Sequence, residues 1–286
     1  WPTLFFGMFF NNLFFWCANQ MIVQKALAAK NLKESQKGAI YLSLFKVFGP
    51  LITVLPGVVA FNYFNGSIDK SDNAYPALVT SVLPEWAFGL FGAVIFGAIL
   101  SSFVGSLNST TTLLTLDFYK PIFGKNKSDK HIARVGHIAT VVIGVIVVAL
   151  APVISLFPSG LYAVVQQFNG VYSMPVLALI LVAFFSKRTS KLGAKVTLFT
   201  HIILYAIISF VFTEINYLYT FSVLFFVDLI IILIFNKVKP SSEFDLSTHQ
   251  PKVDMTPWKY RYVAGIIVLA LVVVSYIIFS PLVLAK

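Results

Sequence analysis

Long apolar runs constrain the fold of this chain more than any other feature of its sequence. A helix that crosses a bilayer needs about 20 apolar residues, and we count roughly eight such runs. Only 11% of the residues are charged, less than half of what a soluble domain usually carries. The runs therefore predict an all-α membrane protein, with spans near 3–23, 39–63, 87–116, 132–151, 160–185, 194–213, 217–236 and 261–282.

The positive charge of the chain is concentrated in alternate loops. The formal net charge is +10, and lysine and arginine are frequent after the first, third and fifth runs but not in the loops between them. Cytoplasmic loops of membrane proteins carry such an excess. The charge therefore reports topology in a plasma or inner membrane rather than binding of nucleic acid. We expect the lipid bilayer to surround the protein.

Several chemical classes are excluded by the sequence. The single cysteine, Cys17, rules out an internal disulfide framework and a site with several cysteine ligands. No phosphate-binding loop, catalytic triad or zinc pattern is present. An enzyme or an ATP-driven pump is therefore not expected.

One run carries an unusual stripe of small and hydroxyl residues. Within Gly97–Asp117 the residues recur at steps of three and four, which places them on one face of a helix: Ala98, Ser101, Ser102, Gly105, Ser109 and Thr112. Oxygen atoms aligned inside a membrane either hold helices together or bind an ion. The pattern leaves both interpretations open.

Amides and one lysine interrupt other runs. The first run contains Asn12 among several amides beside Phe15 and Trp16, and the fifth contains Gln166. These amides either bond neighbouring helices or meet a polar solute. Lys46, in the second run, is a functional candidate unless it extends to the membrane surface.

Other polar residues in the runs receive no functional role. Asp228 is interpreted as structural because it lies in a part of the chain expected to be peripheral. The four histidines, His201 among them, are scattered without metal-ligand spacing, and none is assigned a role.

Three segments resemble the sodium:solute symporter family, and within it the sugar-transporting branch. They are NLFFWCANQMIVQKALAAKNLKESQKG (residues 12–38), LPG (residues 55–57) and ILSSFVGSLNSTTTLLTLDFYK (residues 99–120). The resemblance implies a leucine-transporter-type fold of two inverted five-helix repeats. Residues 1–186 would form the second repeat, core helices 6 to 10, and 187–286 about three peripheral helices. The N-terminal repeat would be missing from this chain, which we interpret as a piece of a longer protein.

The same resemblance implies roles for individual residues. Ala98, Ser101 and Ser102 match the sodium site of the eighth core helix, whereas Gly105 lacks the hydroxyl that would help to bind a second sodium ion. The positions that contact sugar match Asn12, Lys46 and Gln166. The inner gate matches Phe15 and Trp16, although relatives often carry tyrosine at the position of Phe15.

The function expected from these features is sodium-coupled symport of a sugar or similar polyol by alternating access. Sodium would be the coupling ion, and the partners would be a sugar-like small molecule and the missing repeat. Two alternatives remain. The carrier could take sialic acid, inositol or another organic solute, or the chain could be a membrane sensor that binds without transporting.

Overall fold

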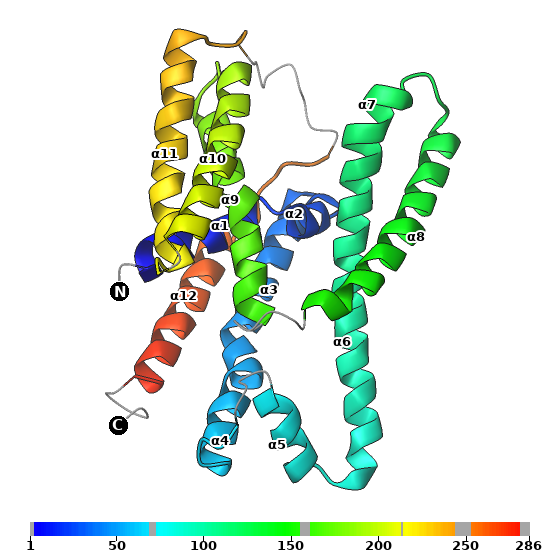
Figure 1. Ribbon diagram of the computed structural model, residues 1–286, viewed down its shortest axis with the longest axis vertical. Coiled ribbons are helices and arrows are strands. Elements are labelled where there is room, and N and C mark those ends of the chain that lie inside the picture. Colours follow the sequence, from blue (N-terminus) through cyan, green and yellow to red (C-terminus); the bar gives the residue numbers. More distant parts are fainter. Residues whose placement is uncertain (1–2, 69–72, 155–160, 213, 244–252, 281–286) are drawn as a thin grey trace. The chain divides into compact units, whose positions relative to one another are not determined.

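The computed structural model describes residues 3–68, 73–154, 161–212, 214–243 and 253–280, and the regular structure within these ranges is entirely helical (Figure 1). Seven helices among the described residues are long and apolar enough to cross a membrane: Leu32–Tyr63, Glu85–Phe123, Asp129–Val153, Val165–Phe185, Lys191–Val211, Tyr217–Val238 and Arg261–Ile278. The all-α membrane fold expected from the apolar runs is therefore confirmed.

The first predicted span is broken into shorter pieces. It consists of η1 (Leu4–Met8), α1 (Phe9–Cys17) and α2 (Gln20–Leu27), and Leu4–Cys17 is shorter than the other seven apolar helices. The helix stops at Ala18, which leaves helical geometry at φ −127°. The next residue, Asn19, accepts a hydrogen bond from the backbone N–H of Met21 through Oδ1 at 2.9 Å. An asparagine in this position starts a new helix.

The helices fall into two compact units. Unit 1 comprises residues 1–24 and 147–250, and unit 2 comprises 25–146 and 251–286. This division follows contacts within the chain and does not test the expected boundary between residues 186 and 187, which stays a prediction. Each unit is described by itself.

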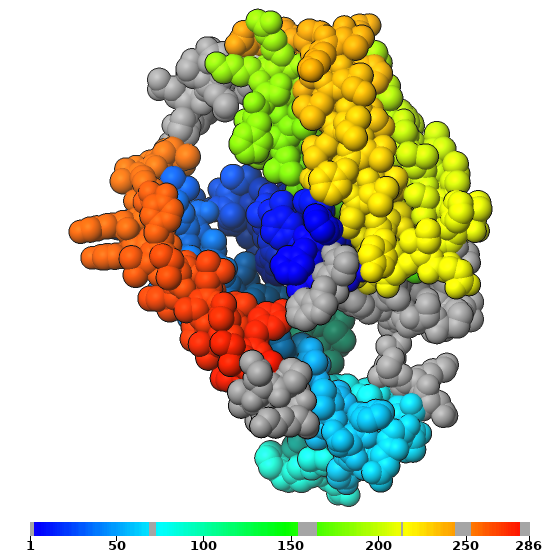
Figure 2. All heavy atoms as spheres, turned by 90° about the vertical axis from the view of Figure 1, so that its left-hand side faces the viewer, coloured from blue at the N-terminus to red at the C-terminus, as the bar shows by residue number. Residues whose placement is uncertain are grey.

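Unit 1 is built around three helices that pack against one another: α9 (Leu161–Phe185), α10 (Lys191–Val211) and α11 (Tyr217–Val238) (Figure 1). η1 and α1 lie directly against α11, as the dark blue and yellow atoms of Figure 2 show. The core consists of Phe14, Met174, Leu177, Ala178, Tyr205, Phe221, Leu224 and Phe225. Phe10 of α1 stacks on Phe225 of α11 with ring centroids 4.0 Å apart.

Gly7 makes the closest approach between η1 and α11. A Cβ atom added at Gly7 would collide with the backbone carbonyl of Leu218, and a backbone atom cannot move aside as a flexible side chain can. Gly7→Ala should therefore destabilise the packing of unit 1 by about 1–3 kcal/mol, the usual cost of overpacking a core. Thermal unfolding in detergent measures the effect.

Gly89 of α6 provides the matched control, because no atom lies within 4 Å of a Cβ built there. Gly89→Ala should unfold at the temperature of the unaltered chain or slightly above it. Equal unfolding temperatures for Gly7→Ala and Gly89→Ala would contradict the packing described for η1.

Unit 2 contains the long helical rod Glu85–Phe123, made of α6 (Glu85–Thr112), η3 (Leu113–Tyr119) and α7 (Lys120–Phe123). The other helices of this unit are α3 (Leu32–Thr53), α4 (Leu55–Tyr63), α5 (Ala74–Val82), the part of α8 (Asp129–Ile154) up to Ile146, and α12 (Arg261–Ile278). The short helix α5 packs against α4, and α12 packs along α3.

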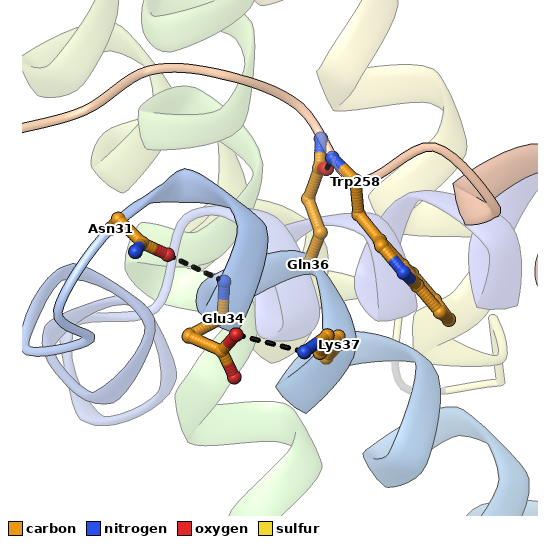
Figure 3. A network of polar contacts seen from close by, with 5 residues as sticks. All are labelled: Asn31, Glu34, Gln36, Lys37 and Trp258. Carbon is orange, nitrogen blue, oxygen red and sulfur yellow. Dashed lines mark hydrogen bonds and ion pairs between the residues drawn. The ribbon is translucent and has the colours of Figure 1, made fainter.

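A hydrogen-bonded strap attaches α12 to the start of α3. The backbone N–H of Trp258 donates to Gln36 Oε1 at 2.7 Å, and the N–H of Leu32 donates to the carbonyl of Asp254 at 3.1 Å. Asn31 caps α3 through the N–H of Glu34 (Figure 3). The strap appears in orange against the blue start of α3 in Figure 2. These bonds thus fix the segment that leads into α12 to the start of α3.

Candidate functional site

The stripe predicted from the sequence divides into two halves along the rod Glu85–Phe123. In the first half Ala98, Ser101 and Ser102 are exposed on α6 of unit 2. In the second half the hydroxyls of Thr110, Thr111 and Thr112 donate to backbone carbonyls one turn earlier, at 2.7–3.0 Å. Such bonds use the proton of each hydroxyl and hold its side chain against its own helix. The first half presents the hydroxyls of Ser101 and Ser102 on the exposed surface of α6.

The second half of the stripe packs against α8. Ser109, Thr111 and Thr115 are buried there, and Gly136 of α8 gives the side chain of Thr115 room. A cavity of about 350 Å³ lies between the two elements, lined by Asn108, Thr111, Thr112, Thr115, Leu116, Lys120, Asp129, Ile132, Ala133, Gly136, His137 and Thr140. The packing interpretation of the stripe thus applies to this half.

The two exposed hydroxyls of α6, beside a small residue, offer oxygen ligands of the kind that sodium takes. Hard cations take oxygen ligands, and neutral oxygens bind them reversibly rather than permanently. Among the described residues no group of three or more histidine, cysteine, aspartate or glutamate side chains could hold a metal ion. Neutral oxygens of this kind are ligands that a weakly held alkali cation takes, and the assignment of Ala98, Ser101 and Ser102 to a sodium site stays a prediction.

Asn12 and the two residues predicted to form the gate lie on α1 of unit 1. The side chain of Asn12 is exposed, and its Nδ2 donates to the carbonyl of Met8 at 2.9 Å, which leaves Oδ1 as an acceptor. Phe15 and Trp16 meet edge to face with ring centroids 5.0 Å apart. Phe14 is buried, and its ring meets that of Tyr172 of α9 edge to face with centroids 5.7 Å apart. The helix thus buries one aromatic residue and presents the polar and aromatic residues predicted to meet a solute.

Gln166 belongs to a ladder of polar side chains on α9. The hydroxyl of Tyr172 donates to Asn169 Oδ1 at 2.8 Å, and Asn169 Nδ2 donates to Gln166 Oε1 at 3.3 Å. These residues are three apart and share one face of the helix. Because Oε1 of Gln166 accepts, its Nε2 group is directed to donate to another acceptor. A solute hydroxyl is such an acceptor.

Lys46 lies on the exposed surface of α3, near the middle of the apolar helix Leu32–Tyr63. It lies seven residues beyond the start of the apolar run at residue 39, roughly 10 Å at 1.5 Å per residue. Extension toward that end of the helix and contact with a solute both stay open for this side chain. A lysine at this depth is a candidate for a functional contact.

The structure assigns the predicted residues to both units. Asn12, Phe15, Trp16 and Gln166 belong to unit 1, whereas Lys46, Ala98, Ser101 and Ser102 belong to unit 2. Their roles in binding stay predictions.

A buried polar pair was missed by the sequence analysis. His201 of α10 and Asp228 of α11 are fully buried, and His201 Nδ1 lies 2.7 Å from Asp228 Oδ2. The available signal was a polar residue at every fourth position of α10, namely Thr197, His201 and Tyr205, all of which are buried. This spacing marks one helix face, and it could have shown that His201 is not an isolated residue.

Comparison with known proteins gives consistent matches over most of the chain. A family model described as the sodium:solute symporter family matches residues 1–201. "Uncharacterized symporter YidK" of Escherichia coli (strain K12) is 38% identical, over 92% of this chain and 46% of the relative. The sodium/glucose cotransporter of Vibrio parahaemolyticus is 33% identical, over 66% of this chain and 37% of the relative. Human sodium/myo-inositol cotransporter 2 is 31% identical, over 68% and 31%. The chain spans less than half the length of each of these relatives.

Proposed function

The chain belongs to the sodium:solute symporter family, and we propose from this premise that it forms the second half of a sodium-coupled carrier for a sugar or a similar polyol. Members of this family are transporters rather than enzymes, and the seven long apolar helices among the described residues make this chain a multi-pass membrane protein. The observation that carries the proposal is the exposed hydroxyl pair, Ser101 and Ser102, on an apolar helix within the matched residues.

Sodium would bind between α6 and a helix of the first repeat. Ala98 supplies a backbone carbonyl and Ser101 and Ser102 supply hydroxyls, while the other half of the site contributes the remaining oxygen ligands. Neutral ligands bind the ion weakly enough to release it on the other side of the membrane. Sodium moving down its gradient stabilises the outward-open state, because that state binds it more tightly than the inward-open one.

The solute would be held by groups that recognise hydroxyls. Asn12 offers an acceptor through Oδ1, Gln166 offers a donor through Nε2, and Lys46 offers charged donors. Phe15 and Trp16 present aromatic surface to the C–H face of a sugar ring. Phenylalanine at position 15 stacks without a hydroxyl, so the gate closes by contact rather than by a hydrogen bond.

Two cargo classes are separated by a competition experiment on the complete carrier. The named relatives include sodium/glucose and sodium/myo-inositol cotransporters, which supports a neutral polyol. Lys46 would equally neutralise the carboxylate of sialic acid. Uptake of a labelled sugar should be inhibited by neutral sugars or inositol in sodium buffer. Uptake of labelled sialic acid by a carrier that takes up no labelled neutral sugar would contradict the polyol assignment.

A sensor that binds without transporting is the alternative from another class. The combination of an exposed hydroxyl pair, an amide–aromatic helix and the break at Ala18 favours a carrier. Reconstituted vesicles distinguish the two, because a carrier accumulates solute inside them. Binding of solute without any accumulation would favour the sensor.

A further inference from the structure

Side chains of α10 contact two backbone carbonyls of α9 in the turn that follows Gln166. Tyr205 donates its hydroxyl to the carbonyl of Gln167 at 2.7 Å, and His201 Nε2 lies 3.0 Å from the carbonyl of Gly170. Pro175, further along α9, lacks the N–H that a helix interior uses, so this part of the helix is held less firmly by its own bonds. Side chains of α10 thus fix the backbone immediately after Gln166.

Both ring nitrogens of His201 face oxygen atoms. A carbonyl can only accept, so the hydrogen bond to Gly170 requires a proton on Nε2. The other nitrogen, Nδ1, faces Asp228 Oδ2 at 2.7 Å. That short contact also requires a proton, which lies either on Nδ1 beside a carboxylate or on a neutral carboxyl group that donates to Nδ1. In both arrangements the pair as a whole is neutral.

The buried surroundings of the His201–Asp228 pair also favour a net charge of zero on the pair. Asp228 Oδ1, Ser173 Oγ and Thr197 Oγ1 are buried with no hydrogen-bond partner among the described residues, and a net negative charge with an unpartnered oxygen is costly in an apolar interior. The titratable group stacked on His201 is Tyr205, with ring centroids 6.0 Å apart. The described parts of α1 and α9 carry no charged residue. α10 and α11 otherwise carry only exposed lysines, Lys191, Lys195 and Lys237. No second cation from these helices compensates Asp228.

We propose that His201 and Asp228 share one bound proton and act as a positioning pair that holds the backbone of α9 at Gly170 and so orients Gln166 toward the solute. The proposal rests on the proposed function for the role of Gln166, and on the contacts of His201 alone for the proton. The pair does not touch the solute. It acts through the helix that carries Gln166.

Substitutions of Asp228 and His201 in the complete carrier test the positioning role. Asp228→Asn supplies an amide N–H to His201 Nδ1 without needing the shared proton, so the half-saturation concentration for solute should stay within about twofold. The double variant His201→Phe with Asp228→Leu removes both partners, which buried pairs tolerate. Its half-saturation concentration should rise about tenfold, the value of one lost hydrogen bond, with little change in maximal rate. A merely structural pair would lower the maximal rate through loss of folded carrier and leave half-saturation unchanged; that result would overturn the positioning role.

Nitrogen NMR of the histidine rings in this chain tests the proton independently of transport. The His201 signals, assigned by their loss in His201→Phe with Asp228→Leu, should show a protonated Nε2, because the carbonyl of Gly170 can only accept. An unprotonated Nε2 would overturn the proton-holding pair. If no solute is transported at all, the proposed function fails, whereas the ring spectra still decide the proton.

Discussion

Replacing Ser101 or Ser102 by alanine should remove most of the sodium dependence of solute uptake by the complete carrier. Each substitution deletes one hydroxyl oxygen from the proposed ion site. Because interactions with a charged partner are worth about 1.5–3 kcal/mol, the apparent affinity for sodium should fall about 10- to 100-fold. Uptake measured against sodium concentration gives this affinity directly.

The control for this experiment is Thr110→Ala on the same rod. Thr110 is exposed, and its hydroxyl is already bonded to the carbonyl of Ser106 at 3.0 Å. Its removal should leave the sodium dependence unchanged. If Ser101→Ala and Ser102→Ala behave like Thr110→Ala, the first half of the stripe is not an ion site.

Lys46→Ala should weaken the apparent affinity for solute about tenfold or more, with a smaller effect on sodium. The lysine contributes a charged donor, whose hydrogen bonds are stronger than neutral ones. Uptake at fixed sodium and varied solute concentration separates the two effects. Lys37→Ala is the control, because Lys37 forms an ion pair with Glu34 at 2.8 Å near the start of α3 and exposed pairs contribute little.

Unaltered solute affinity in Lys46→Ala would show that this side chain extends away from the solute. A loss of sodium affinity larger than the loss of solute affinity would instead assign Lys46 to the ion site.

The helical architecture was predictable because the membrane makes length and hydrophobicity decisive. A bilayer leaves no water for backbone groups, so each long apolar run must be a helix. The break at Ala18 was partly visible, since amides around Asn19 interrupt the first run. Its position was not, because it depends on the hydrogen bond from Met21 N–H to Asn19.

The His201–Asp228 pair could not be found from composition or charge. The two residues lie on different helices and meet only when α9, α10 and α11 pack, and a lone histidine in an apolar helix is usually without a functional role.

The stripe on α6 could likewise be predicted only in part from the sequence. Its spacing predicts one helix face, but packing against α8 decides which hydroxyls remain exposed, and this separates Ser101 and Ser102 from Ser109 and Thr111.

The expected sodium stoichiometry rests on the resemblance to relatives that carry a hydroxyl ligand for a second ion at the position of Gly105. Gly105 lies one turn beyond Ser101 and Ser102 and has no side-chain ligand. We therefore expect one sodium ion to accompany each solute molecule.

The most direct test of the account measures sodium and solute entry together, in vesicles that contain the complete carrier. The account predicts that solute accumulates only under an inward sodium gradient and that the two enter in equal amounts. Solute entry that proceeds equally well when potassium replaces sodium would contradict it.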